Sequence, residues 1–300
     1  MNGGVGVARD SLEGLVLGDA FGQSWFVRDA EAGERWLAGR VLRPGPWKWT
    51  DDGAMAIVLY EHLVRYGEVR EDVLAAGFAA EYARDPYRQY GASMHEVLER
   101  IGAGEDWRAV TAEQFDGQGS WGNGAAMRVA PLGAWFRTDL AMVVEQARRS
   151  ALATHAHPEA VAGAVAVAVA AALAAAGRGG PAPSRPEFLR EVAARVAPSE
   201  VRTLLLEAAA LPAGTTVREA ADRLGSGWRI SAPDTVPFAL WCAALSPDDL
   251  PEALWRTVEG WGDRDTTCAI VGGVIAARTS LSAVPAQWRA HTEAVPARRP

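Results

Sequence analysis

The chain has 300 residues, of which 49% are hydrophobic and 22% charged, and this composition excludes a disordered protein. Its formal net charge of -7 disfavours extensive contact with nucleic acid or with an anionic membrane. The two cysteines, Cys242 and Cys268, lie in apolar surroundings without CxxC spacing, which excludes a zinc–thiolate site and fits a reducing cytoplasm.

Helical periodicity dominates the chain, and no convincing hairpin signal interrupts it. Segments rich in Ala, Leu, Val and Arg alternate with Gly and Pro punctuation. They predict helices over 7–17, 54–66, 71–83, 139–151, 158–176, 186–196, 199–211, 217–224, 233–245, 248–258 and 266–277. The sequence therefore predicts an all-α fold.

Helix-start signals support several of these boundaries. They are Thr50 before an Asp pair, Pro158, Ser199 before Glu200, and Asp265 with Thr266 ahead of an apolar run. The stretch 160–176 has no charge, but it is short and alanine-rich for a membrane span, so we expect a buried central helix. The connection 177–186 is the candidate boundary, yet the helical texture is the same on both sides. We expect one domain over residues 1–300, and a monomer.

Two acidic clusters attract attention because each has two carboxylates and a hydroxyl group at the start of a strongly apolar helix. They are Thr50, Asp51 and Asp52 in the first cluster, and Asp263, Asp265 and Thr266 in the second. Three interpretations remain open: helix-capping acids, a metal-free catalytic carboxylate pair, or a divalent-metal site. If both helices are buried, the crowded carboxylates repel one another unless a cation lies among them, and oxygen ligands select Mg²⁺, Mn²⁺ or Ca²⁺.

Three further motifs are candidates for a binding site. GNGAAMRVAPLG, from Gly122, lets backbone N–H groups approach an anion closely, although a turn followed by a packing face gives the same pattern. In THAHP, His155 and His157 precede a helix and either line a polar pocket or cap and pack; their spacing disfavours metal ligation. In GLVLGDAFG, Asp19 is either close to a ligand or a turn residue.

These motifs, in this order from Gly14 to Gly273, resemble the ADP-ribosylglycohydrolase family. The resemblance implies a compact multi-helix bundle that binds two Mg²⁺ ions, or Mn²⁺ in some members. It also implies hydrolysis of the bond between C1″ of ADP-ribose and a protein side chain or small acceptor. Nucleic acid would then be a partner only as a modified substrate.

The resemblance also assigns roles to residues of this chain. The implied metal ligands are Thr50, Asp51, Asp52, Asp263, Asp265 and Thr266. The implied ADP-ribose site consists of Gly122, Asn123, Gly124, Ala125, Ala126 and Met127 near the diphosphate, with His155 beside the nucleotide. The ions would orient the distal ribose, while Asp52 and Asp265 act as catalytic carboxylates at an oxocarbenium-like centre and activate water.

The chain departs from the family pattern at several positions. Many relatives have a glutamate where an ungapped alignment places Phe26, so the identity of the general base is open. Gly53 stands where relatives usually have a hydroxyl residue after the Asp pair, and Thr267 stands where an asparagine is common. Arg264 lies between Asp263 and Asp265. The alternative function is therefore a catalytically silent ADP-ribose-binding protein of the same fold.

A second enzyme class shares one of the motifs. Residues 263–267 also fit the DxDxT signature of haloacid-dehalogenase-type phosphotransferases. In that fold the motif ends a strand near the start of an α/β sheet, whereas here it follows a helical segment near the end of the chain. The context therefore disfavours this reading.

Overall fold

The computed structural model describes residues 2–295, and within that range the regular secondary structure is helical, which confirms the all-α prediction. The first helices are α1 (Asn2–Gln23), α2 (Ala30–Ala38), α3 (Asp51–Tyr66), α4 (Glu71–Arg84), α5 (Ala92–Gly102) and α6 (Trp107–Gly117). The middle of the chain forms α7 (Gly124–Met127), α8 (Ala130–Trp135), α9 (Leu140–Leu152), α10 (Pro158–Ala176), α11 (Arg185–Ala193) and α12 (Glu200–Ala210). The last are α13 (Val217–Leu224), α14 (Ala232–Leu245), α15 (Leu250–Val258), α16 (Arg264–Thr279) and α17 (Ala286–His291).

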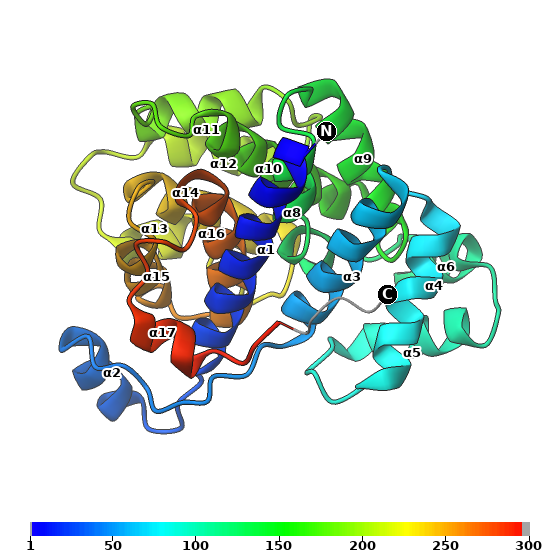
Figure 1. Ribbon diagram of the computed structural model, residues 1–300, viewed down its shortest axis with the longest axis horizontal. Helices are drawn as coiled ribbons and strands as arrows, with labels where there is room; N and C mark the ends of the chain where they lie inside the picture. The colour runs from blue at the N-terminus through cyan, green and yellow to red at the C-terminus, as the bar shows by residue number, and fades with distance from the viewer. Residues whose placement is uncertain (1, 296–300) are drawn as a thin grey trace.

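Helices α1 and α16 lie side by side at the centre of the molecule (Figure 1). Glycines at four-residue intervals on α1 make this approach possible, because a Cβ atom on Gly18 or Gly22 would collide with backbone carbonyls of α16. The sequence predicted that the first helix ends at residue 17, but α1 continues to Gln23. The glycines face a partner helix and do not terminate their own.

The other helices surround this pair. Helices α4, α5 and α6 lie on one side of it, and α11 to α15 on the other (Figure 1). The sequence analysis missed α2, α5, α6, α7, α8 and α17. Each of these is 11 residues or shorter, and in so short a segment an amphipathic pattern is hard to distinguish from a loop.

Helix α10 is the buried central helix that the sequence predicted. Its length and composition would also suffice to cross a membrane, but 78% of its most apolar window is buried inside the fold. Alanine side chains allow neighbouring helices to approach closely: a Cβ atom on Gly133 of α8 would collide with the carbonyl oxygen of Ala168. We therefore describe α10 as a core helix.

The connection after α10 is attached to the core. Arg278, near the end of α16, donates hydrogen bonds to the carbonyl oxygens of Gly177 and Gly180 at 2.6 Å each. Its Nε also donates to Asp248. The segment that the sequence suggested as a candidate domain boundary is therefore held against α16.

An aromatic cluster fixes the end of α1 to the C-terminal part of the chain. Phe21 stacks on Trp288 of α17 with ring centroids 4.7 Å apart, and meets Trp47 and Trp255 edge-on. Trp25 packs edge-on against Trp255. Such contacts contribute about 0.5–1.5 kcal/mol per pair beyond area burial, so the loop that follows α1 leaves from a rigid base.

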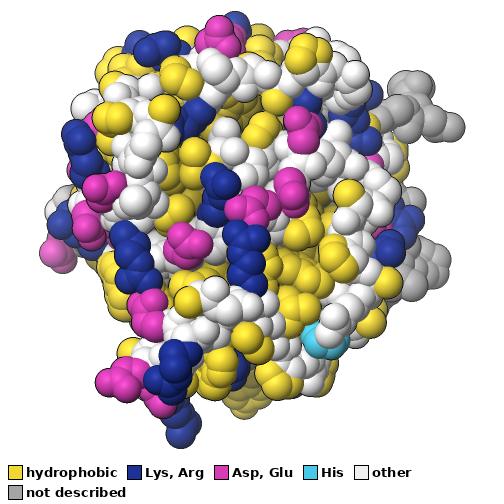
Figure 2. All heavy atoms as spheres, turned by 90° about the vertical axis from the view of Figure 1, so that its left-hand side faces the viewer, with side chains coloured by type: hydrophobic (Ala, Val, Ile, Leu, Met, Phe, Trp, Pro, Cys, Tyr) yellow, Lys and Arg dark blue, Asp and Glu magenta, His cyan; other side chains and the backbone are white. Residues whose placement is uncertain are grey.

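The surface shows no large region of one charge on the face that carries α2, α13 and α15 (Figure 2). Basic and acidic side chains alternate there and form ion pairs, including Arg40 with Glu252 and Arg218 with Glu34. Pairs of this exposed kind contribute little to stability.

Two glycines of α1 provide a stability test. Gly14→Ala is expected to lower the free energy of unfolding by about 1–3 kcal/mol, because its Cβ atom would lie 2.5 Å from the carbonyl oxygen of Gly272 in a packed core. Gly6→Ala is the matched control: no atom lies within 4 Å of the added Cβ, so it is expected to stabilise the helix by up to about 1 kcal/mol. Urea unfolding of both variants measures the difference, and equal stabilities would contradict the proposed packing.

Candidate functional site

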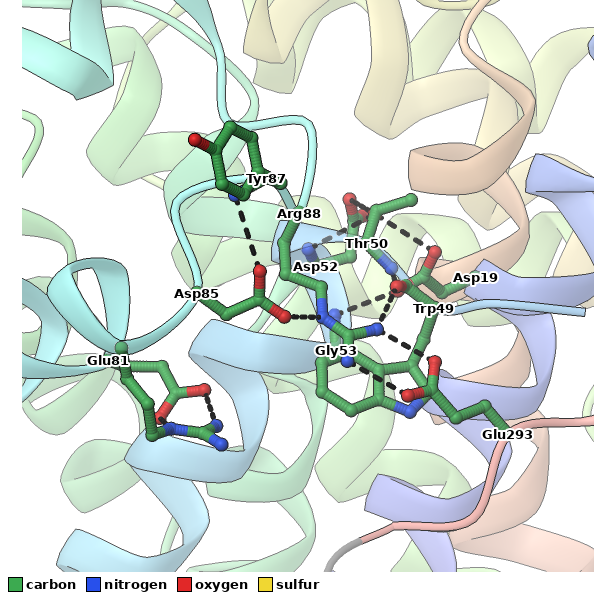
Figure 3. Close-up of polar contacts among 11 residues, drawn as sticks. Asp19, Trp49, Thr50, Asp52, Gly53, Glu81, Asp85, Tyr87, Arg88 and Glu293 are labelled. Carbon is green, nitrogen blue, oxygen red and sulfur yellow. Dashed lines mark hydrogen bonds and ion pairs between the residues drawn. The ribbon is translucent and has the colours of Figure 1, made fainter.

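Asp19 organises the start of α3 from within α1. Its Oδ2 accepts hydrogen bonds from the backbone N–H groups of Thr50 (2.8 Å) and Gly53 (2.9 Å), and Thr50 Oγ1 lies 3.0 Å from its Oδ1 (Figure 3). Asp19 is fully buried. The sequence analysis noted this residue but left its role open. The sequence signal that points to Asp19 is an isolated acid among small apolar residues.

The two acidic clusters meet at Asp52. Thr50 caps α3, with Oγ1 accepting from the Asp52 N–H at 3.4 Å, as the sequence predicted. Asp52 Oδ2 lies 3.1 Å from Thr50 Oγ1 and 3.5 Å from Thr266 Oγ1 of α16. The starts of α3 and α16 therefore lie side by side and bring the two acidic clusters together.

The start of α16 differs from the prediction in one respect. The sequence predicted a helix that begins at Thr266, with Asp265 as a start signal before it, but α16 begins at Arg264 and its N-cap residue is Asp263. Asp265 and Thr266 lie in the first turn, where the Thr266 N–H donates to Asp265 Oδ1 at 3.0 Å. Free backbone N–H groups at both helix starts thus face the acids and stabilise negative charge there.

Mutual repulsion and burial perturb these carboxyl groups. Burial raises the pKa of Asp51, Asp52 and Asp265 well above the ordinary value, and the neighbouring acids raise each pKa further. The pKa of Asp19 rises to about 8 through burial and the charge of Asp265, despite the N–H donors of Thr50 and Gly53. The cluster therefore favours any process that brings positive charge into it.

The donor groups fit a hard divalent cation. Carboxylate and hydroxyl oxygens are the ligands that Mg²⁺ and Mn²⁺ prefer, and Asp52 Oδ1 is buried without a hydrogen-bond partner. Among the described residues, no three His, Cys, Asp or Glu side chains are already gathered around one point as metal ligands. The residues therefore fit a divalent cation in the chemistry and closeness of their oxygen atoms. The carboxylate side chains would turn toward a bound ion.

Asn123 joins the glycine-rich segment to the acids. Its Nδ2 donates to Asp263 Oδ2 at 2.7 Å and to Thr235 Oγ1 at 3.1 Å. Gly124 packs against the ring of His155, because an added Cβ atom would lie 2.9 Å from Cε1. The helix that follows, α7, is short, and the side chains of Ala125, Ala126 and Met127 are buried in the core.

His155 is buried beside this segment as a neutral imidazole. Thr154 Oγ1 lies 2.7 Å from its Nδ1 and accepts a hydrogen bond from Arg128 Nη2 at 2.9 Å. Burial and the Arg128 charge lower the pKa of His155 to about 3. His157 has the other role that the sequence allowed: its Nδ1 accepts from the Glu159 N–H and caps α10.

Sequence reasoning missed two arginines near the acids. Arg128, within the GNGAAMR motif, is fully buried over the ring of Phe78, and burial lowers its pKa to about 9 while the charge of Asp51 raises it. Arg88 stacks 3.5 Å from the ring centroid of Trp49 and donates to the Trp49 carbonyl next to Thr50 (Figure 3). The sequence signal for Arg128 is a cation among small apolar residues, and no spacing pattern in the sequence points to Arg88.

Arg88 also holds the C-terminal segment. It forms a two-point ion pair with Glu293 and a third contact with Asp85. Paired Arg–carboxylate geometry of this kind is directional. The loop between α4 and α5, the start of α3 and the segment after α17 are therefore joined at one guanidinium group.

Comparison with known proteins identifies the family. The sequence model of the ADP-ribosylglycohydrolase family matches residues 7–299. The chain belongs to the ADP-ribosylglycohydrolase family. It is 30% identical over 324 aligned residues to ADP-ribosylhydrolase ARH3 of Homo sapiens, which covers 95% of this chain and 88% of that protein. It is 36% identical to ADP-ribosylhydrolase ARH3 of Xenopus tropicalis over 171 residues, covering 52% of this chain and 47% of that protein.

A solved structure shares the fold. The protein described as "ADP-ribosylglycohydrolase-related protein complex" superposes with a TM-score of 0.69 at 24% identity, covering 98% of this chain and 94% of that chain. The fold and family that the sequence motifs implied are therefore confirmed, and the enzyme class is that of the ADP-ribosyl hydrolases. The roles of individual site residues stay predictions.

The neutral state of His155 has a measurable consequence. In the unfolded chain, His155 has a pKa near 6.5 and takes up a proton below this pH. In the folded chain the pKa of His155 is about 3, so the imidazole stays neutral over the same range. The stability contributed by neutral His155 is therefore complete above about pH 6.5 and declines as the pH falls toward about 3. Denaturant unfolding of the wild type and His155→Gln between pH 7 and 4 isolates this slope. An imidazole that titrates near pH 6.5 by NMR would contradict the assignment.

Proposed function

We propose that this protein hydrolyses the C1″ glycosidic bond of ADP-ribose attached to a protein side chain or small acceptor, using two Mg²⁺ ions. One observation carries the proposal: Asp52 of α3 and Thr266 of α16 meet in a buried acidic cluster. Asn123 links this cluster directly to the glycine-rich segment. A site for cations and a site for an anionic group therefore adjoin.

The metal ions would be held by Thr50, Asp51, Asp52, Asp263, Asp265 and Thr266. When bound, they would neutralise the acids and fix the vicinal hydroxyls of the distal ribose, and Mn²⁺ would serve in the same way. The buried, unpaired Asp52 Oδ1 supports this assignment, because an unsatisfied carboxylate oxygen at 1% residue exposure is costly unless it gains a partner.

Asp52 and Asp265 are the proposed catalytic carboxylates. Their negative charges would stabilise an oxocarbenium-like centre at C1″, and one of them would accept the proton of the attacking water. The side chain of Phe26 carries no exchangeable proton, and the residue is 45% exposed in the loop after α1. The general base in this proposal is therefore an aspartate of the cluster.

The nucleotide end would lie along Gly122 to Met127. The N–H groups of Gly124 and Ala125 would approach the diphosphate. The other N–H groups of this segment already donate within the fold, to Ser120 Oγ, Ile230 O and Asn123 O. Neutral His155 packs against Gly124 and offers one donor and one acceptor without adding a cation. Its role would be to shape the pocket beside the nucleotide.

A second candidate function is a catalytically silent ADP-ribose-binding protein. The observation that favours it is Phe26, an apolar side chain at a position where many relatives have a proton-carrying one. Tight binding of ADP-ribose without release from any ADP-ribosylated substrate would select this alternative.

Chelation tests the metal assignment. In excess EDTA, release of ADP-ribose is expected to fall to background, because the acids repel one another and the ribose loses its anchor. Adding Mg²⁺ is expected to restore release and to raise the melting temperature, since an ion bound only to the folded state stabilises it. Full activity in chelator, with no effect of Mg²⁺ on melting, would exclude the metal site.

Removal of single acids tests the catalytic roles. Asp52→Ala and Asp265→Ala are each expected to lower kcat by at least about 10²-fold. Neither variant should melt below the wild type in EDTA, because each removes a repelling carboxylate from a buried cluster. Asp222→Ala, an exposed residue of α13, is the control and should retain wild-type activity. Activity within threefold of the wild type in either cluster variant would contradict its role.

A further inference from the structure

The side chain of Arg264 lies between two aromatic rings beside the acidic cluster. Its guanidinium carbon is 4.1 Å from the ring centroid of Phe26 and 5.0 Å from that of Trp261. Its Nη1 donates to the carbonyl oxygen of Trp25 at 2.9 Å, while its Nε is buried without a partner. Arg264 is only 7% exposed, so its position is determined by this stack.

Both rings are themselves anchored. Trp261 has a left-handed backbone (φ 55°), donates from its indole N–H to Glu34 of α2, and lies against Gly33, where an added Cβ atom would be 3.0 Å from Cη2. Phe26 follows the aromatic cluster at the end of α1 and reaches the solvent. The guanidinium of Arg264 is thus held in place between two anchored rings.

Arg264 is adjacent in sequence to two of the proposed ligands. Asp265 and Asp263 are the carboxylates whose charges act most directly on it, and a guanidinium keeps its proton inside proteins. A permanent positive charge therefore lies in the wall next to the acids. The glycine-rich segment reaches the same acids through Asn123, whose Nδ2 donates to Asp263 and to Thr235 of α14.

We propose that Arg264 is a specificity-determining residue that disfavours positively charged acceptors and directs the enzyme to ADP-ribosyl linkages with uncharged acceptors. The proposal rests on the proposed function. In this proposal the acceptor leaves C1″ on the side of the exposed Phe26 ring, against which Arg264 lies. A serine oxygen or an ester is neutral there, whereas an ADP-ribosylated arginine carries a guanidinium that the Arg264 charge repels.

The test compares two peptides of the same sequence, one ADP-ribosylated on serine and one on arginine, with Mg²⁺ present. The measured quantity is the ratio of kcat/KM for the serine-linked to the arginine-linked peptide. The wild type is expected to favour the serine-linked peptide. R264Q is expected to lower the ratio about tenfold, mainly by improving cleavage of the arginine-linked peptide.

Matched variants separate charge from packing. R264K keeps the charge but loses the planar stack, so its ratio should stay within threefold of the wild type even if both rates fall. R43Q removes a guanidinium that stacks 3.9 Å from the ring of Trp36, outside the acidic cluster, and should leave the ratio unchanged. If R264Q does not fold, F26E places a carboxylate against the guanidinium from an exposed position and should lower the ratio. F26Q is the control for F26E, because it removes the ring without adding a charge.

The outcomes are distinct. A ratio that stays within twofold of the wild type in both R264Q and F26E, or equal losses on the two peptides, would overturn the role of Arg264 while leaving the hydrolase intact. A preference of the wild type for the arginine-linked peptide would overturn it as well. Absence of release from both peptides, in wild type and variants alike, would instead overturn the proposed function.

Discussion

The close approach of α1 and α16 is the constraint on which the site depends. Gly14, Gly18 and Gly22 let the two backbones come nearer than side chains would permit, and Asp19 lies on the same helix between them. From that position Asp19 accepts hydrogen bonds from the first turn of α3. Three segments that are distant in sequence are therefore held at one point, and the acidic cluster follows from this packing.

The same packing stores electrostatic free energy. Desolvating an ion costs several kcal/mol in a protein interior, and Asp51, Asp52 and Asp265 are buried together. Helix N-termini and the N–H donors around Asp19 recover part of this cost, and Arg264 and Arg128 contribute positive charge nearby. The remainder would be relieved by a bound cation. In the proposed function, stability and activity would therefore oppose each other at these residues.

Positive charge is arranged unevenly around the acids. Arg128 is fully buried and connects through Thr154 to His155. Arg264 lies between the rings of Phe26 and Trp261. Arg88 joins the start of α3 to the C-terminal segment through Glu293. Each guanidinium lies against an aromatic ring, which helps to orient a planar cation, and Arg88 is held in addition by Glu293 and Asp85.

The fold class, the family and the residue types of the candidate site could be predicted from the sequence. Helical periodicity is local, and the motifs around Asp52, Asn123 and Asp265 are short, so both can be recognised without knowing the packing. The folded chain was needed to show that Asp19 organises α3, that Asp52 Oδ2 lies next to Thr266, and that Arg264 is held between Phe26 and Trp261. These contacts join residues up to 239 positions apart, as for Arg264 and Trp25. No local pattern specifies such pairs, because they depend on which faces of distant helices pack together.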